Sequence, residues 1–355
     1  MIFNYNKIKE NKLTYVIAEI GVNHECSLSK AKKMIYLAKK GGASAAKFQT
    51  YKSETISSKH SPAYWDTKKE KTKSQYMLFK KYEKFEKKDY ITLAKYCKKI
   101  KIDFLSTPFD VNSINFLNKL VPAFKISSSD ITNLQLLKKV AMTKKPIILS
   151  TGAANVKEIK FAVNFLKKNG SKKIILLHCI LNYPAKDENA NLLMINHLNK
   201  NFPNHIIGYS DHTLPNKLML NLTTAYILGA KVLEKHFTLN KKLKGNDHYH
   251  SMDFEDLKSF TKNLDKIKNI IGKSSKKKVL KSEIKSRKYA RRSLVIKKDL
   301  KKGDYLNNSN IISLRPVKGI PAEKLNFVIG KKIKKNKKAG EHLLYKDVFN
   351  LKRNQ

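Results

Sequence analysis

Eight short apolar runs rich in β-branched residues recur between residues 14 and 238, and amphipathic stretches separate them. The runs occupy residues 14–21, 43–50, 102–108, 123–129, 146–152, 172–179, 205–211 and 230–238. The stretches between them include 27–42, 155–170 and 215–230, where apolar residues fall near helical spacing and a glycine stands at or near the end. This alternation predicts βα units and a parallel sheet.

The number of units selects among the parallel folds. Eight units in about 250 residues match a closed (β/α)8 barrel, the TIM-barrel fold. An open, doubly wound sheet is the alternative, but neither GxGxxG nor GxxxxGK[ST] follows any of the runs. The sequence therefore favours the α/β class, with a barrel domain over residues 1–272.

The connection between the second and third runs is the longest. A helix over 75–100 accounts for half of it, and the remainder, 51–75, is polar and contains the only tryptophan, Trp65. Long loops in compact domains are commonly functional. This loop leaves the carboxyl end of a strand, so we expect it to form a lid over a substrate.

The C-terminal part of the chain has a different pattern. A last helix over 253–271 is followed by a lysine-rich linker at 273–288. Residues 289–355 then hold short apolar segments broken by turns, among them 290–300, 310–321 and 327–336. We expect a small, mainly β domain that is marginal alone, because so small a core buries little surface.

The net charge raises the question of a polyanionic partner. The 355-residue chain has 74 Lys and Arg against 28 Asp and Glu, a formal charge of +46, which is compatible with nucleic-acid binding. Only five of these 74 residues are arginines, the type preferred for bidentate contacts to bases and phosphates. We therefore favour a solvated lysine coat and no nucleic-acid partner; the lysine runs at 273–281 and 330–338 are the best sites for the alternative.

Cysteine usage and the N-terminus indicate the compartment. Cys26, Cys97 and Cys179 are too few and too far apart for a disulfide scaffold or a cysteine-based zinc module. The N-terminus lacks an apolar signal core, and no run approaches the roughly 18 apolar residues of a membrane span. We expect a cytoplasmic protein without a membrane partner.

Polar side chains end nearly every expected strand, and in this fold the carboxyl ends of the strands form the active site. The residues concerned include Glu19, Lys47, Gln49, Thr107, Lys125, Ser128, Asp130, Ser150, His178, Tyr183, Ser210, Asp211, His212, Glu234 and His236. A single polar residue at a strand end is weak evidence for function. Because all eight expected strands carry such residues near their ends, the sequence predicts a functional site at this end of the barrel.

Lys47 and Lys125 stand within otherwise apolar strands, where a buried ammonium group must find an anion or shift its pKa. One interpretation is a phosphate or carboxylate ligand. Hydroxyl donors for it are Ser128, Ser150 and Ser210. The other interpretation is internal ion pairing, for which the nearby carboxylates are Glu19, Asp130 and Glu234.

His212 and His236 close the seventh and eighth strands, which are neighbours in a barrel. Two imidazoles with carboxylates nearby suit a divalent transition metal that keeps open positions for a substrate. Two hydrogen-bonded core histidines are the alternative, and residue types alone do not separate the two.

Short motifs in matching order extend over nearly the whole chain. They are AEIGVNHECSLSKA (18–31), AAKFQT (45–50), FLSTPFD (104–110), FKISSSDITN (124–133), PIILSTG (146–152), LLHCILNYP (176–184), IGYSDHT (207–213), LEKHFT (233–238) and GNDHYHSM (245–252). In these the chain resembles the bacterial sialic acid (N-acetylneuraminate, nonulosonic acid) synthase family. The segments 289–295 and 314–321 resemble the antifreeze-like or SAF domain of that family. The sequence departs from the family's pattern at Asp130, Leu181 and Val317.

The resemblance implies a transferase that condenses phosphoenolpyruvate with an N-acylated mannosamine-type sugar and releases phosphate by C–O cleavage. It implies catalytic roles for Glu19, His212 and His236, with both histidines binding Mn²⁺ or Mg²⁺. It implies phosphoenolpyruvate binding by Lys47, Thr107, Lys125, Ser128, Ser150 and Ser210. It implies sugar binding by Gln49, Tyr183, Asp247 and Arg315, with Arg315 reaching the active site of the partner in a homodimer.

Two other functions stay open from the residues. One is a related phosphoenolpyruvate-dependent synthase or lyase on the same barrel that takes phosphorylated sugars, against which the absence of an additional arginine cluster argues. The other is an inactive homologue that binds polyanions. The sequence does not identify the sugar acceptor or the metal.

Overall fold

Eight parallel strands form one sheet in the first of two compact units, Met1–Ile271. The computed structural model describes residues 2–245, 247–272 and 274–351 of the chain. The strands are β1 (Tyr15–Gly21), β2 (Ala45–Thr50), β3 (Asp103–Pro108), β4 (Phe124–Ile126), β5 (Ile147–Ser150), β6 (Ile174–Cys179), β7 (Ile206–Asp211) and β8 (Val232–His236). Each lies within its expected run, so all eight predicted strands are confirmed.

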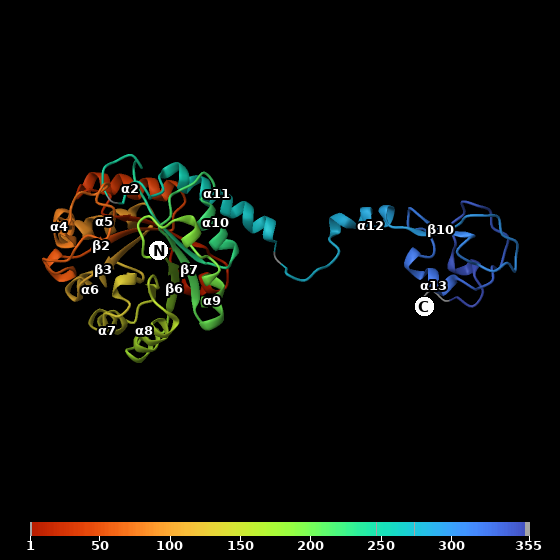
Figure 1. Cartoon of the computed structure of the whole chain (residues 1–355), viewed down its shortest axis with the longest axis horizontal. Helices are drawn as coiled ribbons and strands as arrows, with labels where there is room; N and C mark the ends of the chain where they lie inside the picture. Colours follow the sequence, from red (N-terminus) through yellow and green to blue (C-terminus); the bar gives the residue numbers. More distant parts are fainter. Residues whose placement is uncertain (1, 246, 273, 352–355) are drawn as a thin grey trace. The chain divides into compact units, whose positions relative to one another are not determined.

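Strand β1 lies between β2 and β8 in the sheet, and the barrel closes where the two end strands, β3 and β4, meet. Glu19 of β1 is in register with Lys47 of β2 on one side and with His236 of β8 on the other. Strands β3 and β4 lie side by side, although no ladder joins them among the described residues. Figure 1 shows helices around the strands, so the predicted TIM-barrel fold is confirmed.

Helices follow the strands and cover the outside of the barrel. They are α2 (Leu28–Lys40), α3 (Ser53–Ile56), α4 (Gln75–Tyr82), α5 (Lys87–Lys99), α6 (Val111–Leu117), α7 (Leu134–Met142), α8 (Val156–Lys168), α9 (Met194–Asn201), α10 (Leu220–Ile227) and α11 (Phe254–Ile271). The expected single helix over 75–100 is wrong. It is divided into α4 and α5 because Glu86 and Asp89 form a capping box that begins α5 anew.

Side chains two residues apart on a strand share one face, so each strand contributes alternately to the barrel interior and to the layer beneath the helices. The inner cluster includes Ile17, Leu105 and Ile148, all fully buried. Ile8 of helix α1 (Tyr5–Lys9) joins this cluster, and Asp103 accepts hydrogen bonds from the backbone N–H groups of residues 2 and 3. The N-terminal segment thus covers one end of the barrel, and the strand-end polar groups lie at the other.

The second unit, Gly272–Gln355, is built around one antiparallel pair. Strand β9 (Ser293–Ile296) pairs with β10 (Ile311–Leu314), and isolated bridges extend this arrangement, as the mainly β prediction requires. The helical elements are η3 (Lys281–Glu283), α12 (Ile284–Ala290), η4 (Ala322–Lys324), α13 (Leu325–Val328) and η5 (Tyr345–Asp347). Residues 327 and 328, expected in a β segment, therefore end a short helix, and the expected linker includes η3 and the start of α12.

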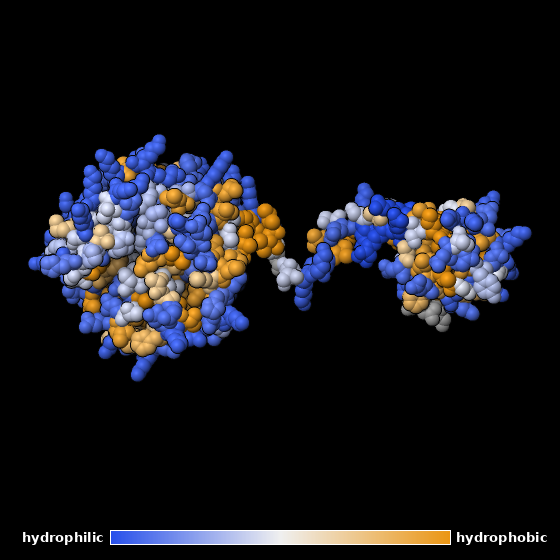
Figure 2. Space-filling model, viewed as in Figure 1, coloured by the Kyte–Doolittle hydropathy of each residue, from blue (hydrophilic) through white to orange (hydrophobic). Residues whose placement is uncertain are grey.

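Lysines dominate the exposed surface. Only four lysines of the described ranges are buried: Lys47, Lys125, Lys235 and Lys337. Hydrophilic side chains project from much of the visible face of each unit in Figure 2, as a lysine coat requires. Within the described residues, no helix has the length and apolar character to cross a bilayer.

Candidate active site

Inward-facing positions near the carboxyl ends of six strands carry a ring of polar side chains. Alternation along each strand places them in the barrel interior, directly beyond the apolar cluster. The residues are Glu19 (β1), Lys47 (β2), Thr107 (β3), Lys125 (β4), Ser210 (β7) and Glu234 (β8), all buried. We call these six residues the charged layer.

The two lysines of the charged layer contact two carboxylates. Lys47 Nζ lies 2.6 Å from Glu19 Oε2 and 3.7 Å from Glu234 Oε1, and Lys125 Nζ lies 3.3 Å from Glu234 Oε1. Internal pairing with Glu19 and Glu234 is therefore confirmed. Pairing with Asp130 is wrong, because that carboxylate accepts instead from the side-chain amide of Asn133 at 3.0 Å.

Burial and charge act against each other on these groups. Burial is the largest effect on Lys47 and opposes its charge, but the carboxylates of Glu19 and Glu234 together raise its pKa. Burial lowers the pKa of Lys125 and raises that of Glu19. For Glu234 the two ammonium groups outweigh burial, so its pKa is lowered. The layer thus holds fixed charges and one carboxylate with an increased affinity for a proton.

The hydroxyl groups in and around the charged layer differ in whether they form hydrogen bonds. Lys47 Nζ donates to Thr107 Oγ1 at 3.2 Å, and Ser210 Oγ donates to Glu234 Oε1 at 3.0 Å. Ser128 Oγ accepts from the backbone N–H of Gly152 at 3.0 Å. Ser150 Oγ is buried without a hydrogen-bond partner among the described residues. An oxyanion beside the lysines would supply the acceptor that this hydroxyl lacks.

Three imidazoles and a phenol form a second cluster. The ring centroids of His212 and His236 are 5.7 Å apart, and those of His236 and His250 are 5.0 Å apart. Tyr183 contacts all three, with its centroid 4.2 Å from that of His212. Burial lowers the pKa of His212 to about 4, and burial together with the nearby imidazoles lowers the pKa of His236 well below its ordinary value. Both imidazoles are therefore neutral near pH 7, as a metal ligand must be.

The residues of this cluster fit a divalent metal ion. His236, Asp247 and His250 each offer a ligand atom, and these atoms all lie within 4.8 Å of one another. His236 Nδ1 is buried, has no hydrogen-bond partner among the described residues, and lies 3.6 Å from Asp247 Oδ2. His212, predicted as a ligand with His236, adjoins the set, and its Nδ1 is hydrogen-bonded to the carbonyl oxygen of Ile180 at 2.6 Å.

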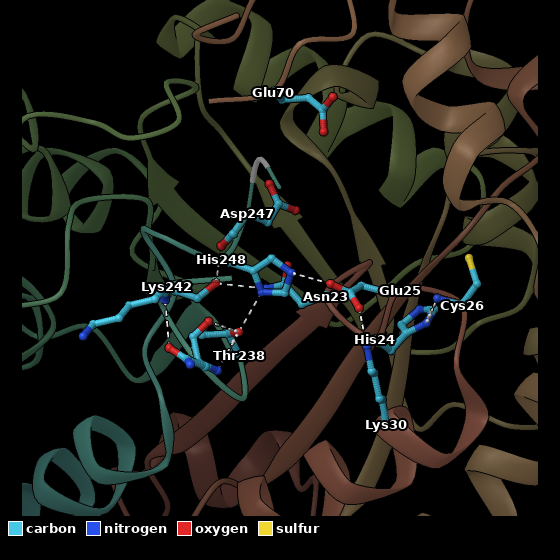
Figure 3. A network of polar contacts seen from close by, with 12 residues as sticks. Asn23, His24, Glu25, Cys26, Lys30, Glu70, Thr238, Lys242, Asp247 and His248 are labelled. Atoms are coloured by element: carbon cyan, nitrogen blue, oxygen red, sulfur yellow. Dashed lines mark hydrogen bonds and ion pairs between the residues drawn. The ribbon is translucent and has the colours of Figure 1, made fainter. Parts of the chain in front are cut away.

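The loop after β8 carries Asp247 and His250 and is fastened to the β1–α2 connection. His248 is hydrogen-bonded to Thr238 Oγ1 at 2.7 Å and lies 3.5 Å from Glu25 Oε1 (Figure 3). Asn23 donates to Ser251 Oγ and to the carbonyl oxygen of residue 237, both at 3.0 Å. Burial, with the nearby carboxylate of Glu19, raises the pKa of Asp247 to about 7.

A cavity of about 590 Å³ lies one layer beyond the charged layer. Gln49, Ser127 and His236, which line it, each follow a charged-layer residue by two positions on the same strand or just past its end. Aromatic and aliphatic side chains form much of its wall, including Tyr51, Ile56, Tyr64, Trp65, Leu78, Phe79, Tyr82, Phe109 and Leu181. Among the described residues that line it, none is Lys or Arg.

The expected lid loop contributes to this cavity. Tyr64 and Trp65 line the wall, and the indole N–H of Trp65 is tied to the carbonyl oxygens of Glu70 and Thr72 at 3.1 Å each. Lys69 Nζ lies 5.5 Å from the ring centroid of Tyr249, which joins the loop to the segment after β8. The loop therefore forms part of the cavity wall, and its role as a lid over a substrate stays a prediction.

The predicted sugar-binding residues fall into two groups. Gln49, Tyr183 and Asp247 line the cavity, and Gln49 Nε2 also donates to Glu19 Oε1 at 3.1 Å. Arg315 belongs to the second unit, where it is exposed. The sugar-binding role of all four residues stays a prediction.

Two strand-end residues lie outside the site. His178 is hydrogen-bonded to the carbonyl oxygen of residue 190, and Asp211 pairs with buried Lys235 at 2.7 Å. Alternation explains this, since each is one position from an inward-facing residue. Conversely, the sequence pattern does not predict that Glu234 lies between the two lysines or that His250 joins the imidazole cluster. The signal for His250 is the second histidine in the segment GNDHYHSM.

The fold and this arrangement are typical of a barrel enzyme, with buried charged groups at the carboxyl ends of the strands and a cavity beside them. A model of the NeuB family matches residues 34–276, and a SAF domain model matches residues 291–348. The chain belongs to the NeuB family, the sialic (nonulosonic) acid synthases, whose general chemistry joins phosphoenolpyruvate to a sugar.

Individual relatives agree with this assignment. The chain is 43% identical to N,N'-diacetyllegionaminic acid synthase of Campylobacter jejuni over 335 residues, which is 93% of this chain and 98% of that one. It is 32% identical to N-acetylneuraminate-9-phosphate synthase of Drosophila melanogaster, over 97% and 99% of the two chains. The crystal structure of an N-acetylneuraminic acid synthetase from Leptospira borgpetersenii in complex with citrate superposes with a TM-score of 0.68 at 35% identity, covering 78% of this chain and 90% of that one.

Proposed function

We propose that this enzyme condenses phosphoenolpyruvate with a neutral, N-acylated hexosamine aldehyde and releases inorganic phosphate by C–O cleavage. The observation that carries the proposal is the adjacency of two different surfaces. The charged layer, with two buried lysines, suits a small dianion, and the cavity directly beyond it is uncharged over most of its wall. Two substrates held in these positions meet at the level of Gln49 and His236.

The charged layer would bind phosphoenolpyruvate by charge-assisted hydrogen bonds. Lys47 and Lys125 supply the positive charge, and the hydroxyl groups supply directed donors: Thr107, Ser128, Ser150 and Ser210. Both lysines already contact carboxylates, so the incoming dianion must compete with Glu19 and Glu234 for them. This competition favours a compact, doubly charged ligand over a monoanion.

Glu19 would act on the water that completes the reaction. After C3 of the enol attacks the sugar aldehyde, water adds at C2, and the resulting tetrahedral intermediate loses phosphate. The pKa of Glu19 is raised by burial, which suits a group that takes a proton from that water. A divalent ion held by His236 and its neighbours, when bound, polarises the aldehyde oxygen as a Lewis acid.

The lining of the cavity indicates the acceptor. A phosphorylated sugar needs cationic partners, and the described lining has none. Aromatic and aliphatic walls instead suit deoxy and N-acyl groups. We infer that the acceptor is a 2,4-diacetamido-2,4,6-trideoxy sugar of the legionaminic type, with N-acetylmannosamine as the alternative. The similarity to the Campylobacter jejuni enzyme supports the same inference.

A phosphate-release assay tests the proposal. The metal-loaded enzyme is supplied with phosphoenolpyruvate and, in separate reactions, a diacetamido-trideoxy sugar, N-acetylmannosamine and its 6-phosphate. We expect phosphate release to depend on the acceptor and to be fastest with the diacetamido sugar. Faster turnover of the phosphorylated sugar would contradict the acceptor assignment. The absence of release with every acceptor would contradict the synthase function, and steep salt-dependent DNA binding without turnover would indicate the polyanion-binding alternative instead.

We also propose that the active form is a homodimer in which the SAF domain carries Arg315 to the active site of the partner subunit. The exposure of Arg315 supports this, since it has room to engage a surface outside its own unit. Mixing Arg315→Ala with Lys47→Met subunits tests it. Partial recovery of activity in the mixed dimer is expected if the two residues act from different chains, and no recovery would contradict the arrangement.

A further inference from the structure

The side chain of His250 lies beside the residues that fit a metal ion. It is fully buried, its ring centroid is 5.0 Å from that of His236, and it offers a nitrogen within 4.8 Å of ligand atoms of both His236 and Asp247. It lies three residues after Asp247 on the loop that follows β8. Both residues are thus brought to His236 by one short segment.

The surrounding contacts hold this segment against the barrel. Asn23 donates to Ser251 Oγ, and the Ser251 hydroxyl in turn donates to the backbone carbonyl of Asp247 at 2.5 Å. His248 is held between Thr238 and Glu25. In Figure 3, Asp247 and His248 lie on the loop opposite Glu25 and Asn23. The loop therefore presents its ligand atoms from a fixed backbone, which favours coordination over a flexible contact.

The chemistry of the donor set favours one class of ion. Mg²⁺ prefers oxygen ligands and is seldom bound by imidazole, whereas imidazole suits the later first-row ions. Two imidazoles and one carboxylate, with His212 adjoining, form a nitrogen-rich set. Each imidazole added to the set increases the preference for a transition ion over Mg²⁺.

We propose that His250 is a ligand of the divalent metal, together with His236 and Asp247, and that the site selects a first-row transition ion over Mg²⁺. This inference rests on the proposed function, in which a metal activates the sugar aldehyde. It adds a protein ligand to that site and specifies the class of ion. An open coordination position would remain for the substrate oxygen.

Metal binding to the full-length protein tests the inference without turnover. Titration of the metal-free protein with Co²⁺ is followed by d–d absorption, and titration with Mn²⁺ by calorimetry. We expect one ion per chain, and His250→Gln should weaken its binding by at least about tenfold. Electron spin echo modulation of the Mn²⁺ complex should show one fewer imidazole nitrogen in this variant. A large excess of Mg²⁺ should fail to displace Co²⁺ from the wild-type protein.

His197→Gln is the control, because it removes an exposed imidazole of α9 that lies outside the donor set and outside the loop that carries it. It should retain the wild-type affinity. His250→Cys should retain binding and gain a sulfur-to-cobalt charge-transfer band, which a merely structural role would not produce. Unchanged affinity in His250→Gln, or an equal loss in both glutamine variants, would overturn the inference. If His250→Gln keeps its metal while the wild type still releases phosphate, only the inference fails; if metal binding behaves as expected without any phosphate release, only the proposed function fails.

Discussion

Lys47 Nζ and Glu19 Oε2 lie 2.6 Å apart in the barrel interior, on neighbouring strands that are in register at these two residues. Both side chains are at most 3% exposed. The pair is therefore almost completely desolvated, and each charge depends on the other. This makes the anion site sensitive to the removal of either member.

Lys47→Met should cost the protein stability as well as activity. Removing one member of a buried ion pair leaves an uncompensated charge, which costs about 3–5 kcal/mol in the free energy of unfolding. Lys47→Met/Glu19→Gln should recover part of this loss, although both variants should fail to release phosphate. Urea denaturation of the two variants and the wild type measures the effect. A double variant no more stable than Lys47→Met would argue against the coupling.

Gly152→Ala should impair phosphoenolpyruvate binding. A Cβ at this position would lie 2.9 Å from both Ser128 Oγ and Cys179 Sγ, so the serine must shift from its place beside the anion site. We expect a higher KM for phosphoenolpyruvate and little change in the KM for the sugar. Adding Cys179→Ala should restore part of the affinity by making room. A variant with wild-type kinetics would show that Ser128 does not contact the substrate.

Trp65→Ala should affect the sugar rather than phosphoenolpyruvate. The indole lines the cavity, and its N–H fixes the loop through two carbonyl oxygens. Losing this wall should raise the KM for the sugar by about tenfold or more, since burying a large aromatic group contributes over 1.4 kcal/mol. Steady-state kinetics with each substrate varied in turn measures the effect. An increase confined to the KM for phosphoenolpyruvate would contradict our placement of the acceptor.

The stability of the fold should fall in mild acid because of His24. Burial lowers the pKa of this imidazole from 6.5 to about 4, and its Nδ1 accepts a hydrogen bond from the backbone N–H of Cys26 at 3.1 Å. As the pH falls, the imidazole of His24 is therefore protonated in the unfolded chain before it is protonated in the folded protein. The stability that neutral His24 contributes is fully present above pH 6.5. It is lost as the pH falls towards 4, by up to about 3 kcal/mol in the free energy of unfolding.

His24→Asn tests this origin, because its side-chain oxygen can still accept the bond from Cys26. The variant should be less stable at neutral pH, since it loses the ring stacked 4.3 Å from Phe85. Its stability should nevertheless depend less on pH between 6.5 and 4. Denaturant midpoints across this range give the comparison. A pH dependence equal to that of the wild type would assign the acid sensitivity to other groups.

Much of the barrel could be predicted from local pattern. The eight strands follow from short, nearly continuous apolar runs, which are typical of parallel strands buried on both faces. The apolar strands also indicated that Lys47 and Lys125 are buried and need an anionic partner. The single helix expected over 75–100 failed because hydrophobic periodicity continues across residues 83–86, whereas capping by Glu86 depends on local side-chain geometry.

The fold class, the family and the residue types at the strand ends can be read from the sequence, because they depend on residue types at fixed intervals along the chain. Which charged groups contact one another depends on the three-dimensional fold. It placed Glu234 between Lys47 and Lys125 and left Asp130 outside. It also brought His250 to His236 across a loop. The physical reason is that pairing and coordination depend on distances of a few ångströms between strands and loops far apart in sequence, and residue spacing does not encode such distances.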